Sequence, residues 1–276
     1  MNKPSRGLQI LIHAVLLLGV AVTLYPVLWV FKMAFTSSQG FSSGVGLIPD
    51  EPSLDNFRYL FTEVPFVQWF INSLIIAAFT TVIGILLSCT AAYAFSRFRF
   101  PGQQAGLLSF LVTQMFPGVM MMIPLYLIVS TLGLLDTIWG LVLVYSTTSL
   151  PFCVWMLKGY FDTIPKELEE SALMDGASRG VIFWRIIMPL ARPAVAVTAL
   201  FSFMTAWNEF VLAATFMNKE EMYTLPVGLR MFVGQFASEW GYFSAGAILA
   251  SIPVVALFFY LQENLVGGLT AGSVKG

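Results

Sequence analysis

The polar side chains most able to do chemistry in this chain are Asn208 and Glu209, which lie inside an apolar segment near residues 193–216. A charge at the centre of a bilayer costs roughly 2.5–3.5 kcal/mol on insertion scales, so such a residue needs a specific reason. At about 1.5 Å per residue, Asn208 lies roughly 22 Å along a helix that starts at Pro193, beyond the bilayer midplane. Two interpretations remain open. The pair contacts a hydroxylated solute in a wet cavity, or it supplies hydrogen bonds between helices while Glu209 is protonated or shielded.

Two further apolar segments contain polar side chains next to a proline. Tyr145 and Thr148 belong to a polar run just before Pro151, and Gln114 stands three residues before Pro117. A proline inside a membrane helix frees a backbone carbonyl, which a hydroxyl group can satisfy or which can face water. Sugar sites combine hydroxyl and amide groups with aromatic faces, so Tyr145, Thr148 and Gln114 are candidate substrate contacts. Packing between helices is the alternative for each of them.

The sequence offers no constellation of residues for covalent chemistry. His13 is the single histidine, so no serine has a matching base for nucleophilic catalysis. No cluster of His, Cys and carboxylate residues has the spacing of a metal site. No glycine-rich phosphate loop of the Walker type occurs, which predicts that the chain holds no cofactor and does not hydrolyse ATP itself. Cys89 and Cys153 fall in apolar segments, where packing is the expected role and a disulfide is not.

Composition predicts a polytopic membrane protein, with 58% hydrophobic residues and a mean hydropathy of +0.81. A spanning helix needs about 20 mostly apolar residues, and backbone groups in lipid must be satisfied internally. We therefore expect an all-α integral membrane fold with six transmembrane helices in a single membrane domain, residues 1–276. The expected spans are about 8–31, 67–95, 105–131, 136–157, 193–216 and 242–262.

The distribution of Lys and Arg predicts the orientation, because cytoplasmic loops carry an excess of both. With the N-terminus inside, ten of the 14 fall on the cytoplasmic side: Lys3, Arg6, Arg97, Arg99, Lys158, Lys166, Arg179, Arg185, Arg192 and Lys275. The outer segments carry the other four: Lys32, Arg58, Lys219 and Arg230. Both termini are therefore expected in the cytoplasm.

One cytoplasmic segment, residues 158–192, concentrates five of the 14 Lys and Arg residues and five of the 15 Asp and Glu residues. Within it, Gly176 can end a first helix in a left-handed cap. Ser178 can cap a second helix from Arg179 to Met188, which Pro189 interrupts. The pattern predicts a helix–Gly–helix elbow along the membrane surface, with an ordinary amphipathic connector as the alternative.

This segment resembles the EAA loop of ABC-importer permeases in its spacing, Glu170-x-Ala172-x3-Gly176-x9-Ile186-x2-Pro189. Ser171 stands where that family often has Ala, and Met188 where it often has Leu. The resemblance implies that the elbow seats in a cleft of a cytoplasmic ATPase. The residues that it assigns to this coupling are Glu170, Ala172, Asp175, Gly176, Ile186 and Pro189.

Further motifs extend the resemblance along nearly the whole chain. They are RFRFPG at 97–102, TQMFP at 113–117, AWNEF at 206–210 and GLTAGSVKG at 268–276. In this order they are similar to the binding-protein-dependent sugar permeases of the maltose G type. The resemblance implies that a C-terminal tail, residues 265–276, reaches the ATPase through Thr270, Gly272 and Lys275.

The resemblance also implies the rest of the assembly. Its expected partners are a second homologous permease, two ATPase subunits that bind ATP and Mg²⁺, and an extracytoplasmic solute-binding protein. The expected location is the cytoplasmic (inner) membrane of a bacterium or archaeon, and the expected cargo is an oligosaccharide of the maltose, maltodextrin or trehalose type. Another polyol-type solute, such as glycerol phosphate or an amino sugar, is the alternative within transport. A membrane channel or scaffold is the alternative outside it.

Overall fold

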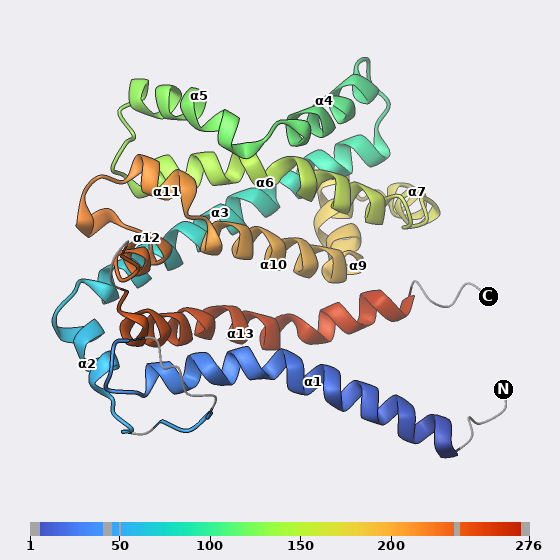
Figure 1. Cartoon of the computed structure of the whole chain (residues 1–276). Helices are drawn as coiled ribbons and strands as arrows, with labels where there is room; N and C mark the ends of the chain where they lie inside the picture. The colour runs from blue at the N-terminus through green and yellow to red at the C-terminus, as the bar shows by residue number, and fades with distance from the viewer. Residues whose placement is uncertain (1–5, 41–45, 50, 235–237, 272–276) are drawn as a thin grey trace. The chain divides into compact units, whose positions relative to one another are not determined.

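The computed structural model describes the backbone of residues 6–40, 46–49, 51–234 and 238–271, and side chains as far as Glu263. Within this part of the chain, four helices are long and apolar enough to cross a membrane: α1 (Arg6–Ala34), α3 (Phe66–Arg97), α6 (Ile138–Phe161) and α13 (Trp240–Ala271). Two bent helix pairs raise the number to six when each pair is counted as one span. The expected all-α membrane fold is confirmed (Figure 1).

The chain also contains shorter helices. They include α2 (Asp55–Thr62), α7 (Glu167–Met174), α8 (Arg179–Ile182), a π-helical turn (Phe183–Ile187), α9 (Met188–Leu190), a 3-10 turn (Glu220–Met222) and α12 (Leu225–Arg230). The chain divides into two compact units. The first comprises residues 1–67 and 228–252, and the second comprises residues 68–227 and 253–276.

The third expected span is two helices rather than one. α4 (Gln103–Met115) and α5 (Gly118–Thr131) meet at 105°, and Figure 1 shows the bend between them. The cause is Pro117, which disfavours helical backbone at the preceding residue. Phe116 accordingly adopts extended angles, with φ −77° and ψ 129°.

The fifth expected span, 193–216, is also interrupted. α10 (Arg192–Asn208) ends at Glu209, whose backbone is extended, and α11 (Val211–Phe216) follows. At its other end, α10 is bent by 79° from the helical stretch Arg179–Leu190 that precedes it. Length and composition therefore predict the position of this segment, but the helix is interrupted at the carboxylate residue Glu209 inside it.

At one point in the second unit, Gly84 of α3 lies close to small residues of α10 and α6, Ser202 and Ser149. A Cβ atom on Gly84 would lie 3.3 Å from the Ser202 hydroxyl. Such small-residue contacts are typical of helix packing in membranes, where no hydrophobic effect drives helices together.

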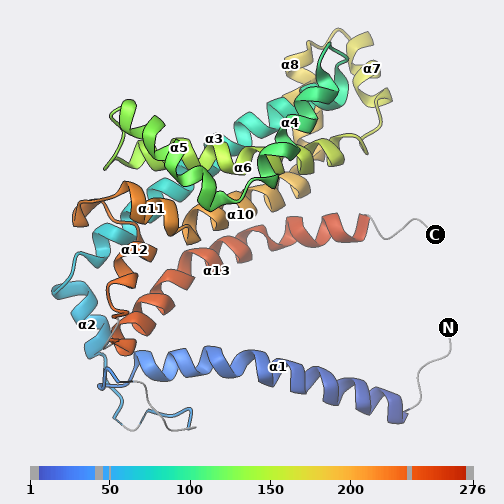
Figure 2. The ribbon, with the colours of Figure 1, turned by 45° about the horizontal axis from the view of Figure 1, so that its top comes forward.

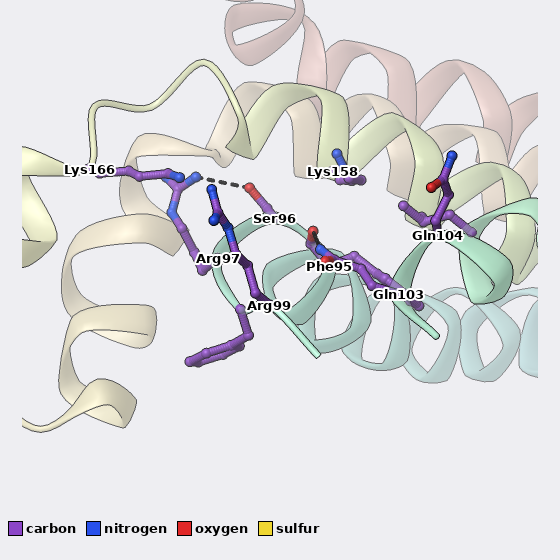
Figure 3. A pocket seen from close by; sticks show the side chains of 10 residues that line it. Phe95, Ser96, Arg97, Arg99, Gln103, Gln104, Lys158 and Lys166 are labelled. Atoms are coloured by element: carbon purple, nitrogen blue, oxygen red, sulfur yellow. Dashed lines mark hydrogen bonds between the residues drawn. The ribbon is translucent and has the colours of Figure 1, made fainter. Parts of the chain in front are cut away.

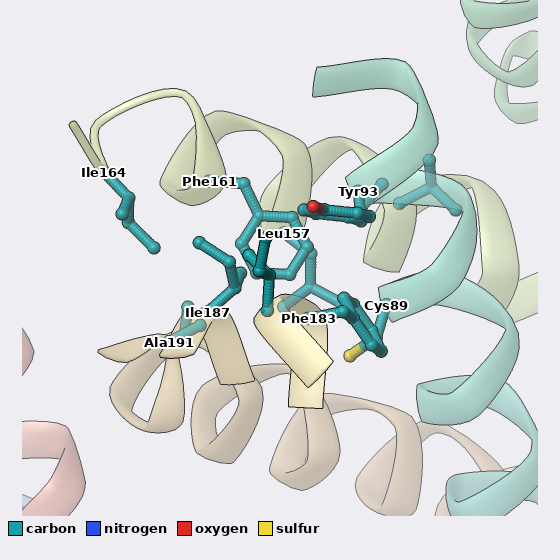
Figure 4. Packing of buried hydrophobic residues seen from close by; sticks show 12 residues of the cluster. Cys89, Tyr93, Leu157, Phe161, Ile164, Phe183, Ile187 and Ala191 are labelled. Atoms are coloured by element: carbon teal, nitrogen blue, oxygen red, sulfur yellow. The ribbon is translucent and has the colours of Figure 1, made fainter. Parts of the chain in front are cut away.

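A hydrophobic cluster lies at the end of α3 and α6 in the same unit (Figure 4). α3 contributes Cys89 and Tyr93, and α6 contributes Leu157 and Phe161, all buried. Ile182, Phe183 and Ile187 reach the cluster from the segment between α6 and α10. The charged segment is thus fastened to the membrane helices by an apolar underside.

The first unit is organised around the buried side chain of Asn56 on α2. Its amide donates hydrogen bonds to the carbonyls of Ala34, at 2.9 Å, and Thr36, at 2.8 Å, which fixes the end of α1. Its own oxygen accepts from Gln39 at 2.6 Å. On the same helix, Tyr59 stacks on Tyr242 with ring centroids 3.9 Å apart. One polar residue and one ring pair therefore hold α2 against its neighbours.

We predict that Gly84→Leu destabilises the protein by about 1–3 kcal/mol, because the added side chain overpacks the contact with Ser202. The measurement is the thermal unfolding midpoint of the detergent-purified protein. Gly159→Leu in α6 is the matched control, since a Cβ atom there meets nothing within 4 Å. Equal midpoints for the two variants would contradict the close packing of α3 and α10.

Candidate functional site

The first helix of the elbow, α7, ends in a glycine cap. Gly176 has φ +84°, a left-handed conformation that favours glycine. The backbone N–H of Ala177 bonds to the carbonyl of Ala172 at 2.9 Å, and that of Gly176 bonds to Leu173 at 3.0 Å. These two bonds form a Schellman motif. The expected left-handed cap at Gly176 is confirmed.

The second helix of the elbow begins as expected and runs further. Ser178 accepts a hydrogen bond from the N–H of Val181 at 3.4 Å, which confirms it as the cap. The expected interruption at Pro189 is wrong, because the helical path continues through α9 to Leu190. A π-helical turn over Phe183–Ile187 precedes the proline. The wider turn accommodates a residue that has no N–H and would crowd the preceding carbonyl.

A buried carboxylate, Glu169, holds α7 against the end of α3. Its side chain pairs with the guanidinium of Arg97 and accepts a hydrogen bond from the Tyr93 hydroxyl at 2.7 Å. Arg97 also donates to the carbonyl of Ile164 at 3.0 Å, in the turn before α7. The Arg97 and Glu169 side chains are 5% and 11% exposed. Removing one partner of such a buried pair is destabilising by about 3–5 kcal/mol, so this contact fixes the elbow on the membrane helix.

A second ion pair stands beside the first. Lys158 near the end of α6 bonds to Asp162 at 2.6 Å, and Ser96 of α3 donates to the same carboxylate at 2.6 Å. Burial raises the pKa of Asp162, but the hydrogen bonds from Lys158 and Ser96 outweigh it and hold that pKa below its usual value. The carboxylate therefore stays charged and keeps both partners in place at neutral pH.

The opposite side of the elbow exposes apolar side chains. Leu173 is 45% exposed, Met174 88% and Trp184 55%. Among the residues assigned to coupling, Glu170, Asp175, Gly176 and Pro189 are exposed, whereas Ala172 and Ile186 are half-buried and pack against the hydrophobic cluster. Several bulky apolar groups next to a charged rim are typical of a protein-binding surface.

Glu209 closes the gap between α10 and α11. One carboxylate oxygen accepts the N–H of Leu212 at 2.8 Å, and the other accepts the N–H of Ala213 at 3.1 Å and the hydroxyl of Tyr145 at 2.5 Å. The side chain thus caps the start of α11 and ties it to α6. Three hydrogen bonds satisfy the carboxylate, as the interpretation of Glu209 as a hydrogen-bonding residue between helices expects.

The other candidate path residues lie near this break on exposed surface. Gln114 donates to the backbone carbonyl of Thr148 at 3.2 Å, and Thr148 lies one turn after Tyr145 on α6. Asn208 donates to Met204 of its own helix at 2.8 Å. Hydrogen bonds therefore link Gln114 to Thr148 and Tyr145 to Glu209. The hydrogen bond described for the Asn208 side chain stays within α10.

The residues that the resemblance assigns to the C-terminal tail lie partly or wholly outside the described part of the chain. Thr270 lies in the backbone of α13, but its side chain is not described, and Gly272 and Lys275 lie outside the described residues. Tyr93, Arg97 and Glu169 are the functional candidates that sequence reasoning missed. The sequence marks Arg97 only as a cytoplasmic cation within a motif, and Glu169 only as one of the five acidic residues of the segment 158–192.

We predict that Glu209→Leu lowers the stability of the detergent-purified protein by about 1–3 kcal/mol, because it leaves the first N–H groups of α11 without an acceptor. Glu209→Gln should have a smaller effect, since the amide oxygen still accepts. Thermal unfolding measures both. Asn208→Ala is the control, because Asn208 is exposed and its amide bonds only within α10. The capping role is wrong if Glu209→Leu unfolds at the parent temperature.

Comparison with known proteins agrees with these features. Residues 84–270 match the family described as the binding-protein-dependent transport system inner membrane component. A galactooligosaccharide transport permease of Bacillus subtilis strain 168 is 40% identical, covering 99% of this chain and 98% of the relative. A maltodextrin transport permease of Streptococcus pneumoniae is 38% identical over 94% of this chain and 93% of the relative.

A solved structure shows the same fold. It is the crystal structure of a bacterial ABC transporter involved in the import of the acidic polysaccharide alginate. The matched chain superposes with a TM-score of 0.81 at 26% identity, covering 95% of this chain and 99% of that one. A second structure, of a bacterial alginate transporter bound to an alginate-loaded periplasmic protein, gives a TM-score of 0.69 at 17% identity and supports the fold.

The relatives are permease subunits rather than enzymes. The match covers well over half of the chain, and the relatives align with it almost from end to end. This chain therefore belongs to the inner-membrane permease components of binding-protein-dependent sugar ABC importers.

Proposed function

We propose that the chain is one of two permease subunits of an ATP-driven importer that carries an oligosaccharide into the cytoplasm. The observation that carries the proposal is the elbow. Its underside is fastened to α3 by Glu169 and Arg97, while Leu173, Met174 and Trp184 are exposed on its outer side. A partner that binds this outer surface would move α3 with it. In an importer that partner is an ATPase subunit.

The remaining assembly follows from the same proposal. A homologous permease would complete the translocation path, two ATPase subunits would bind ATP and Mg²⁺, and a solute-binding protein would dock on the outer side. The N- and C-termini would lie in the cytoplasm, and the tail at residues 265–276 would contact the ATPase through Thr270, Gly272 and Lys275. The excess of Lys and Arg in the assigned cytoplasmic segments supports this orientation.

The proposed cargo is a maltodextrin- or trehalose-type oligosaccharide. The permeases similar to this chain include those named for maltodextrin, trehalose and galactooligosaccharides. The exposed amide and hydroxyl groups of Asn208, Gln114 and Thr148 suit a hydroxylated solute. A polyol-type solute is the second candidate, because a permease named for sulfoquinovosyl glycerol in Agrobacterium fabrum is 34% identical over 92% of this chain.

We predict that binding protein loaded with maltodextrin stimulates ATP hydrolysis and uptake by the reconstituted complex, and that Gly176→Val separates the two activities. A non-glycine residue in the left-handed conformation costs about 1–2 kcal/mol, which lowers the equilibrium constant for the native elbow roughly fivefold to thirtyfold. Uptake per ATP hydrolysed should fall, by at most this factor. The measurement is sugar uptake and phosphate release in the same vesicles.

Gly133→Val is the matched control for this experiment. Gly133 has φ +68°, a Cβ atom there meets nothing within 4 Å, and its backbone forms the same kind of cap at the end of α5. The control should keep its coupling despite equal backbone strain. Equal coupling in both variants would contradict the role of the elbow. If a polyol stimulated ATP hydrolysis and uptake and no oligosaccharide did, the polyol would replace the oligosaccharide as the proposed cargo.

A further inference from the structure

A basic pocket lies where α3 meets α4, beside the elbow but not part of its exposed apolar surface (Figure 3). It encloses about 310 Å³. Four cations line it: Arg97, Arg99, Lys158 and Lys166. Its described lining contains no Asp or Glu residue. Phe95 and Leu107 form its apolar walls. A concave surface with cations and no acid on its lining attracts anions.

Two of these cations have no carboxylate partner among the described residues. Arg97 pairs with Glu169, and Lys158 pairs with Asp162, so their charges are balanced locally. Arg99 and Lys166 are exposed and make no ion pair within the described part of the chain. They leave an excess of positive charge directed at the pocket.

The start of α4 adds to the attraction for an anion. Gly102 precedes this 13-residue helix with φ +83°, and no side chain caps the helix. Gln103 and Gln104 in its first turn line the pocket. The N–H of Gln103 already bonds to the carbonyl of Phe100 at 3.2 Å. The N-terminus of a helix also carries a partial positive charge, which suits the oxygens of a phosphate.

The apolar surroundings favour a lipid as the source of that phosphate. The pocket adjoins the end of the spanning helix α3, and the exposed face of α4 continues from it with Leu108 51%, Leu111 42% and Met115 80% exposed. An anionic phospholipid would place its headgroup among the cations and its acyl chains along this face. Basic pockets of this kind next to membrane helices bind anionic headgroups.

We propose that the basic pocket binds the phosphate group of an anionic phospholipid through Arg99 and Lys166. The two sources of such a phosphate are a phospholipid headgroup and free inorganic phosphate, and the pocket commits to the first because of the apolar face beside it. The proposal places this lipid in the cytoplasmic leaflet. Only that placement rests on the proposed function, because it depends on the orientation proposed for the chain. None of the candidate path residues Gln114, Thr148 and Asn208 lines the pocket, so the site is separate from them.

The experiment compares lipid binding by the purified complex in nanodiscs of phosphatidylglycerol with phosphatidylcholine, or of phosphatidylcholine alone. A cation near an anionic membrane surface contributes enough that its loss lowers affinity about fivefold, and the loss of two lowers it roughly thirtyfold. Native mass spectrometry counts retained phosphatidylglycerol for the parent, Arg99→Gln, Lys166→Gln and the double variant. The Arg6→Gln/Arg192→Gln variant is the matched control, since both arginines are exposed and outside the pocket.

The proposal expects the graded loss in the pocket variants, no loss in the control, and recovery in Arg99→Lys/Lys166→Arg. Equal phosphatidylglycerol retention in the parent and the double variant would overturn it. If the parent protein retained no phosphatidylglycerol but was stabilised by millimolar inorganic phosphate, the phosphate bound in the pocket would not come from a lipid. Unchanged lipid retention with lost ATPase co-purification would instead make the pocket an ATPase contact. None of these lipid-binding results depends on which sugar is carried. Failure of the lipid proposal is therefore distinguishable from failure of the proposed function.

Discussion

The buried carboxylate of Glu169 is the constraint on which the cytoplasmic end of this permease depends. Arg97 and Tyr93 of α3 satisfy it, and Arg97 also holds the turn at Ile164 that leads into α7. A buried ion pair adds little net stability compared with apolar packing, but it tolerates few alternative geometries. The contact therefore specifies where the elbow sits on α3, and the hydrophobic cluster beneath it stabilises that position. The basic pocket proposed to bind a lipid lies in the same region. Its cations Arg99 and Lys166 make no ion pair within the described part of the chain.

In the second unit, a side chain closes the break between α10 and α11, where the interrupted helix exposes backbone groups. Glu209 accepts the N–H groups at the start of α11. Asp136, in the turn between α5 and α6, accepts the N–H of Asn218 in the loop after α11 at 2.5 Å, and that bond lowers the pKa of its carboxyl. Broken helices of this kind are tolerated at membrane depth only where protein or water surrounds them.

Much of this architecture could be predicted from the sequence, because apolar length and the glycine cap act locally. The helices α1, α3, α6 and α13 and the left-handed Gly176 follow from composition and from the absence of a Cβ atom. The role of Glu169 could not be predicted, because its partners lie more than 70 residues away and its local pattern matches any glutamate in a first helical turn. Glu209 was recognised as costly to bury, but its acceptors are N–H groups that exist only once α11 has formed. The path residues Gln114, Tyr145, Thr148, Asn208 and Glu209 remain predictions.

The most direct test of the account is a double-mutant cycle between Arg97 and Glu169, measured as sugar uptake per ATP hydrolysed in the reconstituted complex. Arg97→Met leaves a buried carboxylate without its cation, and Glu169→Gln leaves a buried guanidinium without its anion. Each single change should therefore lower the coupling, and the double variant should be less impaired than either, because it leaves no buried charge unpaired. Independent, additive losses, or full coupling in both single variants, would contradict the claim that this pair transmits movement between the elbow and the membrane helix.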